Sequence, residues 1–196
     1  MSKATTYIIA GVLFTVGVVG GRFLISKAPT NEGNVAQNAT SMIPTSTAQA
    51  ATTSAGPART RRPDFQLPDL DGKNHTVNEW DGKVLVVNFW ATWCTPCRHE
   101  IPFFNKLQAK YAQQGVQFIG IALDDINAVK RFLKVIPIDY PVLIGDDDAI
   151  PIAKAYGNSE GVLPYTVFVD KQGNIISIAE GGLSEEITES TLKKLF

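Results

Sequence analysis

Short apolar segments alternate with segments of helical spacing from Asp64 onward, and this alternation constrains the fold more than any other feature. Val84–Phe89 and Val116–Leu123 are almost uninterrupted apolar runs, which predicts strands buried on both faces. Between them, Pro96–Tyr111 carries its apolar residues three and four positions apart, as one face of a helix does. A strand–helix–strand order of this kind predicts a central sheet covered by helices.

The pattern continues to the end of the chain. A turn at 170–173 predicts that the strands on either side of it pair antiparallel, so the expected α/β sheet is mixed. A turn at Asp71-Gly72 predicts a short N-terminal hairpin. The remaining predicted elements are hairpin strands over Phe65–Leu67 and Thr76–Val77, strands over Tyr140–Ile144, Tyr165–Val169 and Asn174–Ala179, and helices over Asp125–Val135, Asp148–Tyr156 and Ser184–Leu195.

Charge divides the chain into a basic front and an acidic body. Residues 1–63 carry a net charge of +5 and residues 64–196 a net charge of −6, which together give −1. A balance so close to zero predicts no general attraction to nucleic acid. Two cysteines and two histidines exclude a disulfide-stapled small fold and a four-cysteine metal centre, and no cofactor or resident metal is expected.

The front begins with an apolar segment, Tyr7–Ile25, in which Arg22 is the sole charge. It corresponds to roughly 28 Å of helix at ~1.5 Å per residue, close to the thickness of a bilayer core. Residues 1–27 therefore read as a membrane anchor, and a cleaved signal peptide is the alternative. The flanking charges do not decide its orientation. Gly17 and Gly21 have the spacing of a helix-dimerising pair, although chance explains this spacing in so glycine-rich a segment.

Residues 28–63 are rich in Ala, Thr, Ser, Asn and Pro and lack an apolar period, which predicts a flexible linker. Within it, Arg59, Arg61 and Arg62 are expected to be solvated charges. The domain boundaries predicted from the sequence are thus an anchor over 1–27, a linker over 28–63 and a folded domain over 64–196.

The chemistry is carried by Cys94-Thr95-Pro96-Cys97, which lies where a buried strand ends and a helix begins. Free amide groups at a helix N-terminus stabilise a thiolate, and Cys94 is the cysteine nearest to them. Proline fits the first helical turn, where its missing N–H costs nothing. We therefore expect Cys94 to be the exposed nucleophile and Cys97 the more buried resolving thiol. A structural disulfide, or half of a zinc site completed by His75 and His99, is the alternative.

Three segments resemble membrane-anchored thioredoxin-like proteins of the TlpA/ResA/CcmG type. Asn88–Pro102 is similar to their active-site stretch, Leu163–Gly173 to their second signature, and Phe65–Lys83 to their N-terminal hairpin. The resemblance covers residues 64–196 and implies a thioredoxin fold with an added hairpin. It also implies thiol–disulfide exchange and an extracytoplasmic domain, which fixes the orientation of the anchor.

The resemblance implies further site residues. Pro164 corresponds to the family's cis-proline, whereas a trans-proline at a strand edge is the alternative. Leu163 before it would offer backbone groups to a bound peptide. Trp93 is expected to pack beside Cys94 as part of the substrate-contacting surface, and Thr95 and Pro96 complete that surface.

Glu100 follows Cys97 by three residues and so lies on the same face of the helix. The family has an acid at this position, where a carboxyl can take or return the proton of a buried thiol. Asn88 stands where thioredoxin itself has a buried Asp, which makes Glu100 the expected proton carrier. An ordinary exposed glutamate on the helix surface is the alternative.

These features predict a reductase of protein disulfides in the bacterial inner membrane, with its domain in the periplasm or extracytoplasmic space. The resemblance implies apocytochrome c or another oxidised extracytoplasmic protein as substrate, and a membrane electron donor of the DsbD or CcdA type. A peroxiredoxin is an alternative, although Ala91 stands where its pattern requires Thr. A copper chaperone that uses Cys94, Cys97 and His99 is another.

Overall fold

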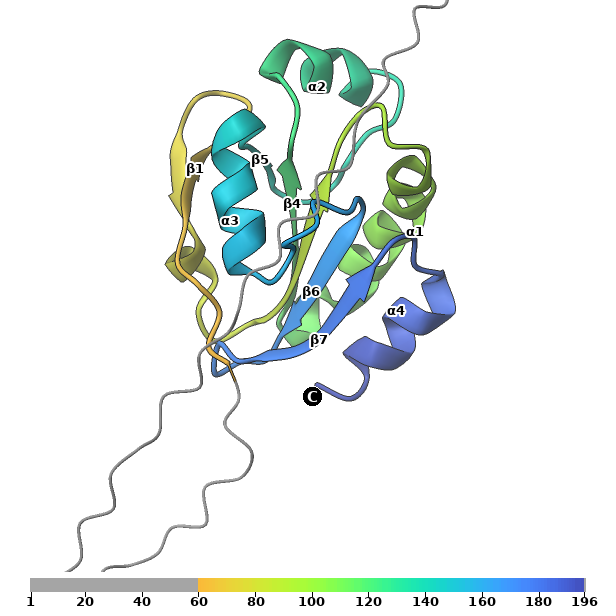
Figure 1. The fold of residues 1–196 in the computed structure, drawn as a ribbon. Coiled ribbons are helices and arrows are strands. Elements are labelled where there is room, and N and C mark those ends of the chain that lie inside the picture. Colours follow the sequence, from red (N-terminus) through yellow and green to blue (C-terminus); the bar gives the residue numbers. More distant parts are fainter. Residues whose placement is uncertain (1–59, 196) are drawn as a thin grey trace, which may run out of the picture. The chain divides into compact units, whose positions relative to one another are not determined.

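The computed structural model describes residues 60–195, and the predicted anchor and most of the predicted linker lie outside them. Within the described residues, no helix is both long enough and apolar enough to cross a bilayer. Five strands form a mixed sheet in the order β5-β4-β3-β6-β7, with β3 in the centre (Figure 1). The strands are β3 Val84–Trp90, β4 Val116–Ala122, β5 Val142–Ile144, β6 Tyr165–Val169 and β7 Ile175–Glu180.

Pairing within the sheet confirms the predicted topology. β3 pairs parallel with β4 and antiparallel with β6. β4 pairs parallel with β5, and β6 pairs antiparallel with β7. All seven residues of β3 are buried, as expected for a central strand covered on both faces.

Helices and the hairpin cover the two faces of the sheet (Figure 1). One face packs against α1 and α4, where Phe104, Leu107 and Leu192 join Val84 and Val86 of β3. The other face packs against α3 and the hairpin strands. Successive residues of β3 point to opposite faces, so one apolar strand supplies both cores. The helices are α1 Thr95–Tyr111, α2 Ile126–Leu133, α3 Ala149–Ala155 and α4 Glu185–Leu192, and the hairpin strands are β1 Gln66–Pro68 and β2 Asn74–Thr76.

The second hairpin strand ends earlier than the sequence predicts. Val77 is not part of β2 but opens a short 3-10 helix, Val77–Trp80. The Thr76 N–H donates to the Glu79 carboxylate at 2.9 Å, which satisfies a donor at the start of this turn. Val77 and Trp80 are buried there, so the turn carries apolar side chains from the hairpin into the core.

The expectation that Arg62 is a solvated linker charge is wrong. Its side chain is buried and forms ion pairs with Asp64 at 2.9 Å and Asp81 at 2.5 Å. It also donates to the Asn78 side chain at 2.9 Å. A guanidinium has five N–H donors in a fixed fork, so three acceptors that converge from different segments can compensate its burial. The local composition of residues 28–63 carries no sign of these distant acceptors.

Candidate redox site

The redox pair lies at the junction between β3 and α1. Cys94 is the N-cap residue of α1, and its sulfur accepts a hydrogen bond from the Cys97 N–H at 3.3 Å. The two cysteines form a disulfide, and their Cα atoms are 5.3 Å apart. Pro96 occupies the first turn of the helix, as predicted. Because this amide already points at Cys94, the same donor is in place to stabilise a Cys94 thiolate after reduction.

The residues of the redox loop differ in solvent exposure, and not in the way that the sequence indicated. Cys94 is 5% exposed and Cys97 is 1% exposed, so the expectation of an exposed Cys94 is wrong for the disulfide form. The disulfide holds Cys94 against Trp90 and Ala91 in one apolar cluster. Trp93 is instead 69% exposed. The surface around the disulfide is therefore formed by the neighbours of the cysteines.

Glu100 lies one turn beyond Cys97 and is almost completely buried. Its Oε1 accepts a hydrogen bond from the Leu183 N–H at 2.6 Å, and its Oε2 lies 3.5 Å from the Asn88 amide nitrogen. Burial raises the pKa of Glu100 to about 7, and these two donors offset only part of that effect. The structure thus contradicts the alternative of an ordinary exposed glutamate.

Asn88 of β3 connects Glu100 to β6. Its amide donates to the Thr166 hydroxyl at 2.9 Å, and the two residues face each other in the sheet register. Thr166 was not identified from the sequence, although a threonine within an apolar strand was a visible signal. Because the amide and the hydroxyl are neutral, Glu100 is the member of this group that can exchange a proton near neutral pH.

The Leu163–Pro164 peptide bond is cis, as the resemblance implied. Pro164 is buried at the start of β6. Leu163 is half-buried and packs against two apolar clusters, one of which contains Cys94 and Cys97. This places the loop before β6 beside the redox pair.

A cavity of about 280 Å³, here called the Trp93 cavity, adjoins the redox loop. Trp93 and Leu163 line it, as do Ile150 of α3 and the residues Asp146 and Asp147 just before that helix. Ile150 is 43% exposed despite its apolar side chain. The sequence predicted Trp93 and Leu163 at such a surface but missed the residues of α3. The two aspartates belong to a short 3-10 turn, Asp146–Asp148, that precedes α3.

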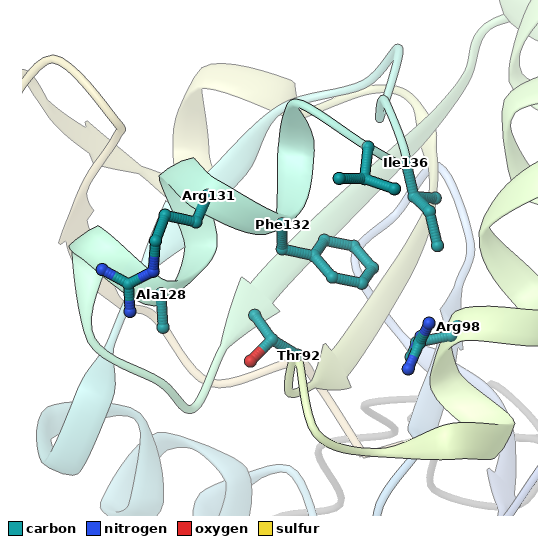
Figure 2. Close-up of a pocket in the computed structure, with 7 residues that line it drawn as sticks. Thr92, Arg98, Ala128, Arg131, Phe132 and Ile136 are labelled. Atoms are coloured by element: carbon teal, nitrogen blue, oxygen red, sulfur yellow. The ribbon is translucent and has the colours of Figure 1, made fainter.

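A second cavity, here called the arginine cavity, has a volume of about 370 Å³. It is lined by Thr92, Arg98 at the start of α1, and residues of α2 and the segment after it (Figure 2). Arg131, Phe132 and Val135 are among them. Arg98 is exposed, and no sequence motif indicates a role for it.

The histidines do not assemble around the cysteines. Both ring nitrogens of His75 are engaged within the hairpin region, with Asp69 at 3.0 Å and Glu79 at 2.8 Å. These carboxylates raise the pKa of His75. His99 is exposed on α1. Among residues 60–195, no group of three or more His, Cys, Asp or Glu side chains is arranged to hold a metal ion.

A five-stranded mixed sheet with a Cys94–Cys97 disulfide at a helix N-terminus and a cis-proline beside it defines a thioredoxin-like thiol:disulfide oxidoreductase. Comparison with known proteins agrees with this class. The Redoxin family model matches residues 57–196, so the chain belongs to this family, and within it to the TlpA/ResA/CcmG type.

Relatives and solved structures support the same placement. The thiol-disulfide oxidoreductase ResA of Bacillus thuringiensis subsp. konkukian is 38% identical over 134 residues, which cover 68% of this chain and 75% of that protein. ResA of Geobacillus thermodenitrificans is 34% identical over the same coverage. A thioredoxin family thiol:disulfide interchange protein of Chlorobium tepidum has a TM-score of 0.64 and 32% identity, covering 72% of this chain and 99% of its own. A thiol:disulfide interchange protein DsbE of the same species has a TM-score of 0.65 and 27% identity, covering 70% and 96%.

Proposed function

We propose that this oxidoreductase works as a reductase of protein disulfides, in which Cys94 attacks, Cys97 resolves and Glu100 carries the proton. The observation that carries the proposal is the burial of Glu100 one turn from Cys97, which raises the pKa of its carboxyl to about 7. A general acid–base group works best when its pKa lies near the working pH. A purely structural disulfide has no need of such a group.

The reaction starts from the reduced pair. The Cys94 thiolate, stabilised by the amide donors at the start of α1, attacks one sulfur of the substrate disulfide. A mixed disulfide forms between Cys94 and the substrate, and the other substrate sulfur leaves and takes a proton from solvent. Trp93, Thr95 and Pro96 are exposed around this point and form the contact surface.

Resolution needs the buried thiol to lose its proton. Cys97 passes this proton to the Glu100 carboxylate, and its sulfur attacks Cys94. The Cys94–Cys97 disulfide forms, and the second substrate sulfur leaves as a thiolate that takes up a proton. Two electrons have moved from the enzyme dithiol to the substrate, which ends as two thiols.

The substrate polypeptide lies in the Trp93 cavity in this proposal. Trp93 and Ile150 offer exposed apolar surface there, and Leu163 lies between the cavity and the cysteines. The backbone of Leu163 is well placed to pair with an extended peptide, as a strand edge does. Asp146 and Asp147 outweigh Lys154 among the charged residues that line the cavity, and this net negative charge favours a basic substrate segment.

The proposal also includes the direction of electron transfer and the cellular location of the domain. The residues between the cysteines, Thr95 and Pro96, include no histidine. A strong oxidant requires a highly stabilised thiolate, and no imidazolium is present between the cysteines to stabilise that of Cys94. The apolar segment Tyr7–Ile25 would hold the domain, through a linker from residue 28, outside the cytoplasmic membrane of a bacterium. Apocytochrome c or another oxidised extracytoplasmic protein is the proposed substrate, and a membrane protein of the DsbD or CcdA type the proposed donor.

Trapping of the mixed disulfide tests the assignment. In cells that express the full chain, Cys97→Ser should accumulate disulfide-linked adducts, because attack still occurs and resolution does not. Cys94→Ser should accumulate few, and the double variant none. Non-reducing gels after rapid acid quenching measure all three. Adducts on Cys94→Ser but not on Cys97→Ser would overturn the assignment.

Location has its own test. A reporter that is active only in the periplasm, fused after Phe196, should be active. Labelling of reduced Cys94 by a membrane-impermeant thiol reagent in intact spheroplasts should succeed. If a reporter that works only in the cytoplasm were active in the same fusion, the proposed orientation would be contradicted.

A further inference from the structure

The loop before Cys94 separates two cavities of different character. Thr92 lines the arginine cavity, and the next residue, Trp93, lines the Trp93 cavity. A protein that presents a sulfur to Cys94 therefore has two distinct surfaces within reach. Asp146, Asp147 and Lys154 line the Trp93 cavity and give it a net negative charge, whereas Arg98 and Arg131 line the arginine cavity.

The two arginines of this cavity are available to an incoming group. Both are exposed, and within residues 60–195 neither guanidinium forms an ion pair or a hydrogen bond. The nearby Asp124 carboxylate accepts from the Thr92 N–H at 3.0 Å and from the Thr92 hydroxyl at 2.5 Å, so it serves to hold the redox loop.

Between the arginines lies an apolar floor. Figure 2 shows Phe132 between Arg131 and Arg98, with its ring directed toward the space above Thr92. The Phe132 ring packs on Trp90 at a centroid distance of 5.3 Å, which fixes it in place. Val135 is 79% exposed at the edge of the cavity. Apolar surface combined with arginines is typical of the centre of protein interfaces.

We propose that the arginine cavity docks an acidic segment, bearing a large apolar side chain, of the dithiol protein that reduces the Cys94–Cys97 disulfide. Charge complementarity selects the occupant, because two free guanidiniums attract carboxylates, whereas the net negative charge of the rest of the domain repels an acidic segment elsewhere. The cavity is formed in the disulfide state, which is the state that an electron donor must recognise. Asp146 and Asp147 would repel the same segment from the Trp93 cavity.

The inference rests on the proposed function and assigns its second half-reaction. A donor thiolate attacks the Cys94 sulfur, and Cys97 leaves as a thiolate that takes up a proton from Glu100. The second donor thiol loses its proton and attacks the mixed disulfide, which releases the Cys94 thiolate. The donor dithiol is oxidised to a disulfide, and the enzyme disulfide gains two electrons.

Two synthetic peptide thiols test the proposal. Each carries one cysteine and one leucine, and the acidic peptide has two glutamates where the basic peptide has two lysines. Reduction of the oxidised full chain in neutral detergent is followed through tryptophan fluorescence at low salt. The measured quantity is the ratio of the acidic to the basic rate. Comparison of this ratio among protein variants cancels the different reactivities of the two thiols.

The decisive variant is Arg98→Gln/Arg131→Gln, and Lys171→Gln is its control. Lys171 is an exposed cation in the turn between β6 and β7, at the end of the sheet opposite Cys94. The double variant should lower the ratio about tenfold, and 0.5 M salt should lower the wild-type ratio similarly. The control variant should leave the ratio unchanged, and each variant's far-ultraviolet circular dichroism should match the wild type.

The outcomes separate the two claims. An equal ratio in wild type, double variant and control would overturn the docking proposal while leaving the proposed function intact. Failure of both peptides to reduce the disulfide, together with an inability of the reduced chain to reduce insulin, would overturn the proposed function itself. A ratio that falls equally in the control would show a general charge effect and would also overturn the docking proposal.

Discussion

The residues on the interior side of the Cys94–Cys97 disulfide differ from those on its surface side in burial and in charge. On the interior side, Glu100 and Asn88 are buried and share a hydrogen-bonded group with Thr166. On the surface side, Trp93 is exposed and fixed charges line the two cavities. Burial raises the pKa of a carboxyl toward neutral pH, whereas exposure leaves charges free to select partners. The difference teaches that proton transfer and partner choice can be changed separately.

The largest expected effect is on the interior side. Glu100→Gln removes the titrating group and nearly keeps its shape, so resolution of the mixed disulfide should slow about 100-fold with every substrate. Stopped-flow decay of an adduct between reduced enzyme and a small aromatic disulfide measures this step. Glu186→Gln, an exposed change on α4, is the matched control and should leave the rate unchanged. Equal rates for both variants would remove Glu100 from the mechanism.

The pH dependence of the unfolding free energy of the oxidised protein should report the titration of the same Glu100 carboxyl. The pKa of Glu100 is raised from 4.5 to about 7, so the folded state holds this proton more tightly than the unfolded chain. Its contribution to stability is complete below about pH 4.5 and is lost as the pH rises to 7, by about 3 kcal/mol. Urea unfolding at several pH values should show this decline in wild type and Glu186→Gln but not in Glu100→Gln. A decline that persists in Glu100→Gln would assign it to another group.

A substitution on the surface side should affect only large substrates, in contrast to Glu100→Gln, which should affect all of them. Trp93→Ala removes an exposed contact, so kcat/KM for a protein disulfide should fall about tenfold through a higher KM. The rate with a small aromatic disulfide should stay within twofold, because that substrate needs no cavity. Unfolding free energy should change little, since the side chain is 69% exposed. An equal loss with both substrates would place Trp93 in the chemistry instead.

The smallest expected effect concerns the charged rim of the Trp93 cavity. Asp146→Asn/Asp147→Asn should slow reduction of a basic peptide disulfide about threefold at low salt and have no effect at 0.5 M salt. Both side chains are exposed, so the fold should tolerate the change. Asp139→Asn, an exposed change outside the residues lining this cavity, serves as the control. A salt-independent effect would point to altered backbone at the start of α3.

Local sequence was enough to predict the redox loop but not the surfaces around it. Cys94, Cys97 and Glu100 lie within seven residues on one helix start, so strand–helix spacing alone brings them together. Residues of α2 and α3 reach the same loop only because β4 pairs parallel with β3 and β5 pairs parallel with β4, and that register is set by packing of the whole sheet. No local pattern indicates that Arg131 lines a cavity with Thr92, or Ile150 one with Trp93.

Contacts between residues far apart in the sequence also could not be predicted from local patterns. Arg62 is buried because Asp81, nineteen positions away, closes an ion pair with it. Thr166 meets Asn88 across seventy-eight positions of sequence. The Leu163–Pro164 bond was predicted through the family resemblance, since an isolated X-Pro bond is cis in only about 5–6% of cases.

The reduction potential of the Cys94–Cys97 pair tests the central claim, that this oxidoreductase is a reductase. The full chain is equilibrated with defined ratios of reduced and oxidised glutathione or dithiothreitol, and the oxidised fraction is measured through tryptophan fluorescence and thiol alkylation. The account predicts a potential nearer to the roughly −270 mV of thioredoxin than to the roughly −120 mV of DsbA. A potential above about −150 mV would make the protein an oxidant and would contradict the account.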